Sequence, residues 1–146
     1  MVLGGIEKLL VPLVEFSREI ANNPNYAEAY AYLGDIALRR NDLTTATENL
    51  TKALQIQASI RLAQYDLGSV YASLNRNEEA AAALKRAIAL DPGQPDAHWK
   101  LARVYQAMGK QAEAKAELAE TTKIHRKQDD ETLLRKIPGE PSAAVR

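Results

Sequence analysis

The residue types that most often catalyse reactions or bind metal ions are few in this sequence and far apart. The two histidines, His98 and His125, are separated by 27 positions, and no cysteine or carboxylate cluster stands at the spacing of a metal site. Gly4-Gly5 and Gly34 do not fit a phosphate-binding loop, and no serine or threonine stands in a recognisable nucleophile motif. We therefore expect no catalytic residue, no cofactor and no metal ion in this chain.

Charge balance and apolar content narrow the class of protein and of partner. The chain has 19 Lys plus Arg and 19 Asp plus Glu, so no net field attracts it to nucleic acid or to an anionic membrane. Hydrophobic residues make up 46% of it, and the abundance of alanine and leucine favours packed helices over a sheet. The sequence shows no signal peptide and no apolar run of the roughly 18 residues that a membrane helix needs. We expect an all-α protein without a nucleic-acid or membrane partner; its cellular location stays open, because the sequence could be part of a longer chain.

A pattern of small and large apolar residues returns every 34 residues. One column of the pattern is Leu33, Leu67 and Leu101. Three more columns are Ala29, Ala63 and Ala97; Ala46, Ala80 and Ala114; and Leu50, Leu84 and Leu118. Each half of a copy shows apolar residues at helical spacing, so one copy predicts two helices joined by a turn. His98 occupies a column of bulky residues, which favours a packing role over a role as ligand or base.

This period and pattern resemble the tetratricopeptide repeat. The resemblance implies a right-handed superhelical solenoid of antiparallel helix pairs. It divides the chain into a half repeat at 1–26, repeats at 27–60, 61–94 and 95–128, a capping helix at 129–137 and a flexible tail at 138–146. The capping helix is expected either to continue the preceding helix or to follow a kink near residues 128–130.

The N-terminal half repeat leaves an apolar cluster with little sequence to cover it. Pro12 suits the first turn of a helix that would run to Ala21, because its missing N–H has no partner there. Either residues 2–8 fold back over the cluster, or another domain or a second copy covers it. The surface predicted for a homodimer consists of Leu9, Leu10, Leu13 and Phe16.

The resemblance also implies which residues line the concave face, because positions 2, 5, 6, 9, 12 and 13 of each repeat point there. The strongest candidates for binding a peptide are Tyr32, Asp35, Tyr65, Asp66, Ser69, Trp99, Lys100 and Arg103. Tyr32, Tyr65 and Trp99 would form an aromatic row, which suits peptide recognition because aromatic rings offer large contact area with few torsions to freeze. A small rotation of the third repeat would instead bury Trp99.

The charges of the predicted face are graded along the array. Asp35 and Asp66 lie toward its first end, whereas Lys100 and Arg103 lie at its last. This grading predicts an extended ligand whose acidic part meets Lys100 and Arg103. Repeat domains that dock the C-terminal carboxylates of chaperones use lysine, asparagine and arginine at positions that here include Asp35, Asp66 and Asp96, so that function is disfavoured.

The sequence thus favours a non-catalytic scaffold that binds a peptide or protein segment in the concave groove. Two alternatives stay open. The repeats could be an accessory domain of a larger protein, such as an enzyme or a secretion or assembly component, or they could be a homodimerisation module that uses the N-terminal half repeat.

Overall fold

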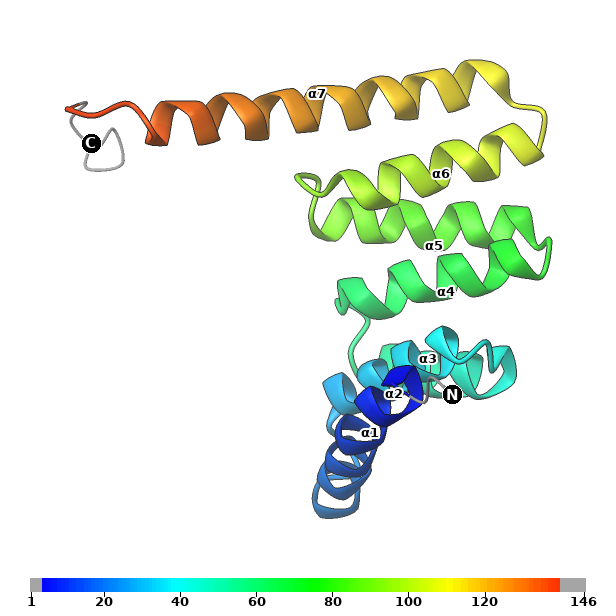
Figure 1. Ribbon diagram of the computed structural model, residues 1–146. Coiled ribbons are helices and arrows are strands. Elements are labelled where there is room, and N and C mark those ends of the chain that lie inside the picture. Colours follow the sequence, from blue (N-terminus) through cyan, green and yellow to red (C-terminus); the bar gives the residue numbers. More distant parts are fainter. Residues whose placement is uncertain (1–3, 140–146) are drawn as a thin grey trace.

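Seven α-helices and no strand make up residues 4–139, the part of the chain that the computed structural model describes, with side chains from residue 10 onward. The helices are α1 (Gly4–Asn22), α2 (Ala27–Arg39), α3 (Leu43–Ile56), α4 (Arg61–Ser73), α5 (Asn77–Leu90), α6 (Pro95–Ala107) and α7 (Gln111–Arg135). Three pairs, α2–α3, α4–α5 and α6–α7, stack along the array (Figure 1). The predicted all-α solenoid is confirmed.

The turn within each helix pair has the same geometry in all three repeats. The middle residue of each three-residue turn has a left-handed backbone: Asn41 (φ 59°), Asn75 (φ 58°) and Gly109 (φ 74°). The N–H of the next residue then donates to the carbonyl five positions back, from Asp42 to Ala37 at 2.9 Å, from Arg76 to Tyr71 at 2.8 Å and from Lys110 to Tyr105 at 2.8 Å. This bond satisfies a carbonyl that the helix end would leave free. Asparagine and glycine suit the turn because they tolerate positive φ.

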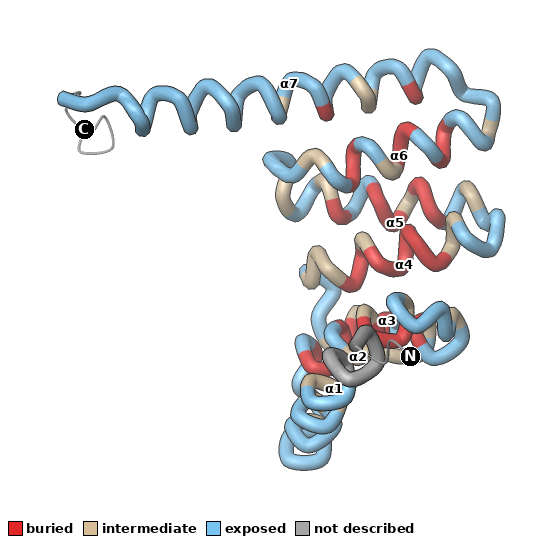
Figure 2. Tube along the Cα trace, viewed as in Figure 1, coloured by how far each residue is buried: buried red, intermediate tan, exposed pale blue. Residues whose placement is uncertain are grey.

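Two glycines let the helices of the first two pairs approach each other closely. A Cβ atom on Gly34 would lie 2.5 Å from Cγ of Leu50, and one on Gly68 would lie 2.7 Å from Cγ of Leu84. Both leucines are fully buried, Leu50 in the core cluster of the first two pairs and Leu84 in that of the last two. Figure 2 shows the buried positions along the stacked helices. The third pair has Ala102 at the equivalent position, and Leu118 opposite it is only partly buried.

The first helix differs from the expected one. It begins at Gly4 and contains Pro12 in its interior, so the prediction of a helix starting at Pro12 is wrong. Proline inside a helix removes one hydrogen bond and costs about 3 kcal/mol, so it ordinarily marks a boundary; here the helix continues on both sides of it. Residues 4–8 extend this helix and therefore do not fold back over the cluster, whereas residues 2 and 3 lie outside the described range.

The last helix runs from Gln111 to Arg135 without a break, so the segment 129–137 is not a helix of its own. Only Ala114 and Thr121 of α7 are buried, and its second half projects past the stacked pairs (Figures 1 and 2). Gln128 makes one contact back to the array, where its Nε2 donates to the carbonyl of Gly93 at 3.4 Å. Residues 140–146 of the expected tail lie outside the described range.

The Gly34–Leu50 contact can be tested by adding one methyl group. Gly34→Ala improves the intrinsic helix propensity by about 1 kcal/mol but overpacks a fully buried leucine, which typically costs about 1–3 kcal/mol. We expect a net loss of about 1 kcal/mol in the free energy of unfolding, measured by urea denaturation. Gly93→Ala is the control, because its Cβ would meet nothing closer than Oδ1 of Asp91 at 3.5 Å. A Gly34→Ala variant as stable as the wild type would show that Leu50 can move aside.

Candidate functional site

An open groove of about 650 Å³ lies along α4 and α6 and reaches the end of α2. Its lining residues are Leu38, Asn41, Tyr65, Asp66, Ser69, Ala72, Ser73, Asn75, Asn77, Trp99, Lys100, Arg103, Val104 and Ala107. Six of the eight candidate residues are among them, and the exceptions are Tyr32 and Asp35. Trp99 is 49% exposed, so the alternative in which it is buried does not apply.

The repeat period explains why these six residues come together. Tyr65 and Trp99 are 34 positions apart, as are Asp66 and Lys100, and Ser69 and Arg103. Each pair therefore occupies one position on two successive first helices. Residues i and i+4 share a helix face, so Tyr65 and Ser69 on α4 line the same groove as Trp99 and Arg103 on α6.

The basic side chains of the groove lie against its aromatic rings. Nζ of Lys100 is 5.0 Å from the ring centroid of Tyr65, and Cζ of Arg103 is 5.5 Å from that of Trp99. Rings at these distances attract cations through the negative potential of their faces. Partial burial lowers the pKa of Lys100, against the attraction of Asp66 and Asp96. The α6 side of the groove thus presents cations held beside flat apolar surfaces.

The acidic side of the groove centres on a buried carboxyl. Asp66 is only 3% exposed, and its Oδ2 atom has no hydrogen-bond partner among the described residues. Burial, together with the charge of Asp35 and a hydrogen bond to it, raises the pKa of Asp66 to about 8. This raised pKa favours the protonated form of Asp66 at neutral pH, whereas the Asp35 carboxylate forms an ion pair with Nε of Arg39 at 3.1 Å.

Tyr32 was expected in the aromatic row but contacts α1 instead. Its ring stacks on that of Phe16, with centroids 4.7 Å apart and planes inclined by 16°. The equivalent position in the next repeats faces the groove, but at the first repeat α1 packs on α2 and offers Tyr32 an aromatic partner. The row that lines the groove is therefore Tyr65 and Trp99.

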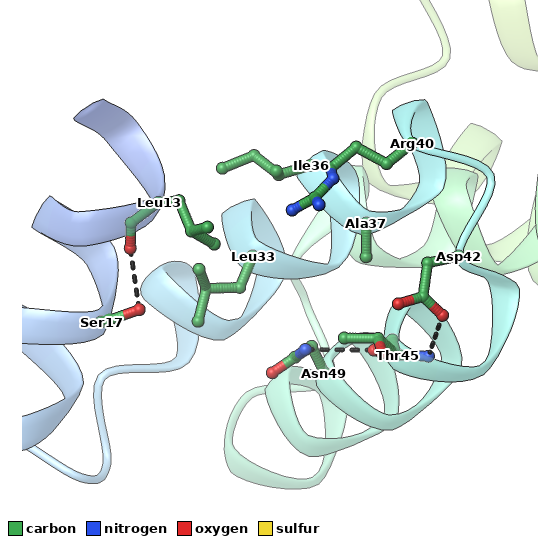
Figure 3. Close-up of a pocket in the computed structure, with 9 residues that line it drawn as sticks. All are labelled: Leu13, Ser17, Leu33, Ile36, Ala37, Arg40, Asp42, Thr45 and Asn49. Carbon is green, nitrogen blue, oxygen red and sulfur yellow. Dashed lines mark hydrogen bonds between the residues drawn. The ribbon is translucent and has the colours of Figure 1, made fainter. Parts of the chain in front are cut away.

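The surface predicted for a homodimer is partly covered within the chain. Phe16 packs on Tyr32, and Leu13 lies beside Leu33 at a small cavity of about 120 Å³ between α1 and the α2–α3 pair (Figure 3). The side chain of Leu9 lies outside the described range, and Leu10 is exposed. Leu13 and Phe16 were assigned to the free face because the sequence did not show how α1 is rotated on α2. Among the side chains of α1 that the structure describes, from residue 10 onward, the exposed large apolar ones are Leu10, Val11 and Val14.

Three polar residues around the small cavity bond to the backbone of their own helix or helix end rather than form a site. Oδ1 of Asp42 accepts the N–H of Thr45 at 3.1 Å and caps α3, and Nδ2 of Asn49 donates to the carbonyl of Thr45 at 3.0 Å (Figure 3). Ser17 Oγ donates to the carbonyl of Leu13 at 2.8 Å. These groups satisfy one another, and the cavity is much smaller than a ligand site.

Two side-chain pairs that join different helices could not be found from the sequence. Arg61 on α4 forms an ion pair with Asp96 on α6, so Asp96, which the repeat pattern placed on the concave face, joins two helices. Nδ1 of His98 on α6 lies 2.6 Å from Oε2 of Glu117 on α7. His98 is buried, which agrees with the packing role, but only the fold reveals its partner because the two residues belong to different helices.

A second open depression, also of about 650 Å³, lies where the α3–α4 junction meets α4 and α5. Its lining is mostly apolar and includes Leu54, Leu67, Tyr71 and Leu90, together with the charged Arg86.

Within residues 4–139, no group of three or more His, Asp or Glu could hold a metal ion. No helix over the same residues is long and apolar enough to cross a membrane.

Three family models match the chain, and all three describe the same kind of repeat. A model described as TPR repeat matches residues 68–109. Two models described as tetratricopeptide repeat match residues 15–60 and 96–127. The matches extend from the middle of α1 into α7, except for residues 61–67 in the first half of α4.

One curated relative and several solved structures are similar to the chain. Cellulose synthase operon protein C of Pseudomonas fluorescens (strain SBW25) is 32% identical over 84 residues, which are 58% of this chain but only 6% of that protein. A crystal structure of MamA is 29% identical, with a TM-score of 0.71 over 77% of this chain and 66% of that chain. A further MamA crystal structure has a TM-score of 0.72 at 22% identity, over 88% of this chain and 68% of that chain, and at that identity it shows the fold alone.

The raised pKa of Asp66 predicts how stability depends on pH. Between about pH 4 and pH 8 the folded chain keeps a proton that the unfolded chain releases, so Asp66 makes the free energy of unfolding fall as pH rises. Asp66→Asn keeps the shape of the neutral acid and removes this titration. We expect the stability of the variant relative to the wild type to increase over this range, by at most about 1.4 kcal/mol per pH unit. Urea denaturation at several pH values measures the slope, and a difference independent of pH would contradict the assignment.

Proposed function

Because this chain belongs to the tetratricopeptide-repeat family, we propose that it is a non-catalytic scaffold that binds an extended segment of another protein in the groove along α4 and α6. The repeats and the solenoid support a protein-interaction role in general. What we propose in addition is that the partner binds in this groove. The observation that carries it is a half-exposed Trp99 beside Tyr65 in an open groove that also presents two cations.

The chemistry of the groove favours a segment with an acidic residue. Tyr65 and Trp99 can contact apolar parts of a bound chain at low cost in torsional freedom. Lys100 and Arg103 stand next to these rings, where a carboxylate of the ligand could reach both a cation and an adjacent apolar surface. Charged groups placed in this way select a partner and fix its register.

The groove also contains groups with shifted pKa values, which often mark catalytic sites. The serine hydroxyls beside them are not arranged as nucleophiles, however. Oγ of Ser69 donates to the carbonyl of Tyr65 at 3.2 Å, and Oγ of Ser73 donates to the carbonyl of Ser69 at 3.0 Å. A nucleophile would need a base as its hydrogen-bond partner. The arrangement therefore supports binding rather than a reaction.

A second candidate function is favoured by the length of the curated relative. The matched repeats are 6% of cellulose synthase operon protein C, so repeats of this kind occur there as a small part of a much longer protein. We propose as the alternative that the present repeats dock within a longer protein, with the exposed Leu10, Val11 and Val14 of α1 as the contact surface. A homodimer through the same surface is the related possibility.

Sedimentation velocity over a concentration series separates these two forms of the alternative. Docking within a longer protein predicts that the present chain is a monomer at every concentration. A dimer that the Leu10→Glu substitution dissociates would instead identify a second copy as the partner, because a charge in an apolar interface is costly to bury.

Charge reversal in the groove tests the main proposal. The probe is a fluorescent peptide obtained by selecting a random twelve-residue phage library on the wild-type chain. We expect the double variant Lys100→Glu/Arg103→Glu to bind the peptide at least about tenfold more weakly in fluorescence anisotropy, because attraction becomes repulsion.

The matched control is the double variant Lys52→Glu/Lys115→Glu, which changes the net charge equally but lies on the second helices α3 and α7. Affinity within about twofold of the wild type is expected for the control. The groove proposal would be lost if the groove variant behaved like the control.

A further inference from the structure

The least compensated group in the groove is the carboxyl of Asp66. The residue is 3% exposed, lines the groove, and has a buried Oδ2 atom with no hydrogen-bond partner among the described residues. Buried polar atoms are normally hydrogen-bonded, and an unpaired one is costly. A buried acceptor at a ligand groove suggests that the bound ligand supplies a donor.

The resident cations near Asp66 are engaged elsewhere. Arg39 donates to Asp35 at 3.1 Å, and Nζ of Lys100 lies over the Tyr65 ring. No ion pair within 4.0 Å joins Asp66 to a lysine or arginine among the described residues. Asp66 at one side of the groove therefore lies next to Asp35, which does not itself line the groove and whose ion pair is with Arg39.

We propose that the groove selects a segment bearing a lysine or arginine side chain, which binds at the Asp35–Asp66 pair, close to an acidic residue that binds at Lys100 and Arg103. This inference rests on the proposed function and specifies the ligand of the same groove. A cation beside the two carboxyl groups would give Oδ2 of Asp66 a charged donor and would displace the proton of Asp66. A ligand with one basic and one acidic residue would place its basic residue at the carboxyl groups and its acidic residue at the two cations of the groove.

The geometry of the repeats sets the spacing between the two charges of the ligand. Asp66 and Lys100 occupy one position on α4 and α6, which are in contact. The axes of packed helices lie about 8–10 Å apart, and an extended chain advances about 3.3 Å per residue. The basic and acidic residues of the ligand should therefore stand about three positions apart.

Binding of a cation at this pair is coupled to the release of a proton. The charged groups that face Asp66 are Asp35 and Arg39 from α2 and Lys100 from α6. Burial and Asp35 hold the proton on Asp66 at neutral pH, whereas a bound cation favours the ionised carboxylate. The affinity for a basic ligand should therefore rise with pH toward about 8, by at most about tenfold per unit for one proton, and level off above it.

The test is a selection of random twelve-residue peptides on the wild-type chain and on Asp66→Asn, with Asp129→Asn on the exposed part of α7 as the control. We expect wild-type and control selections to be enriched in lysine or arginine about three positions from an acidic residue. The Asp66→Asn selection should lose the basic residue but keep the acidic one.

A selected peptide then allows a direct measurement of the pairing. Changing its basic residue to glutamine should weaken binding to the wild type at least about tenfold at pH 8.5, and by about twofold or less with Asp66→Asn. Trp99→Ala should weaken every selected peptide.

The outcomes separate the two claims. Peptides that depend on Trp99 but show no basic residue, or whose basic residue matters equally with Asp66→Asn, overturn this inference and leave the proposed function standing. If no selected peptide depends on Trp99, the proposed groove function falls, and the inference falls with it.

Discussion

The arrangement of the molecule depends on how closely the two helices of a repeat approach each other. At Gly34 and Gly68 the absence of a side chain lets Leu50 and Leu84 pack against the backbone of the facing helix. This contact constrains how α2 and α4 are rotated about their axes, because the leucine fills the space over the glycine. The third pair has Ala102 in place of the glycine, and there the repeat pattern places equivalent residues of α4 and α6 on the same side of the array. The groove is therefore a consequence of the way the core packs.

The sequence was sufficient to predict features that depend on the pattern within one repeat. The helix pairs, the turns that contain Asn41, Asn75 and Gly109, and the convergence of Tyr65 with Trp99 all follow from the period. Contacts of the first helix could not be predicted, because α1 lacks a partner helix of its own repeat. Its course through Pro12 and its stacking on Tyr32 depend on how it sits on α2. The contact between Asp35 and Asp66 was also missed, since it joins different positions of neighbouring repeats.

The groove holds two cations close to a buried carboxyl, and no ion pair among the described residues joins them directly. Lys100 and Arg103 are held beside aromatic rings, whereas Asp66 is held by burial and by Asp35. Direct pairing of Lys100 with Asp66 would remove both groups from the reach of a ligand. Because the rings offer the cations an alternative position, the groove remains able to form charge-assisted hydrogen bonds with a bound segment.

The acid at position 66 is not explained by the requirements of the repeat. The equivalent positions of the neighbouring repeats hold Tyr32 and Lys100, and neither is fully buried, so the solenoid forms without a buried carboxyl there. A neutral side chain of similar shape would avoid both the desolvation of a carboxyl and its repulsion by Asp35. Positions at which a fold departs from its own local rules are frequently functional, because stability is lost there in exchange for a specific interaction. The stability that Asp66 costs between pH 4 and pH 8 is thus the feature that most directly connects the fold of this chain to the ligand we propose for its groove.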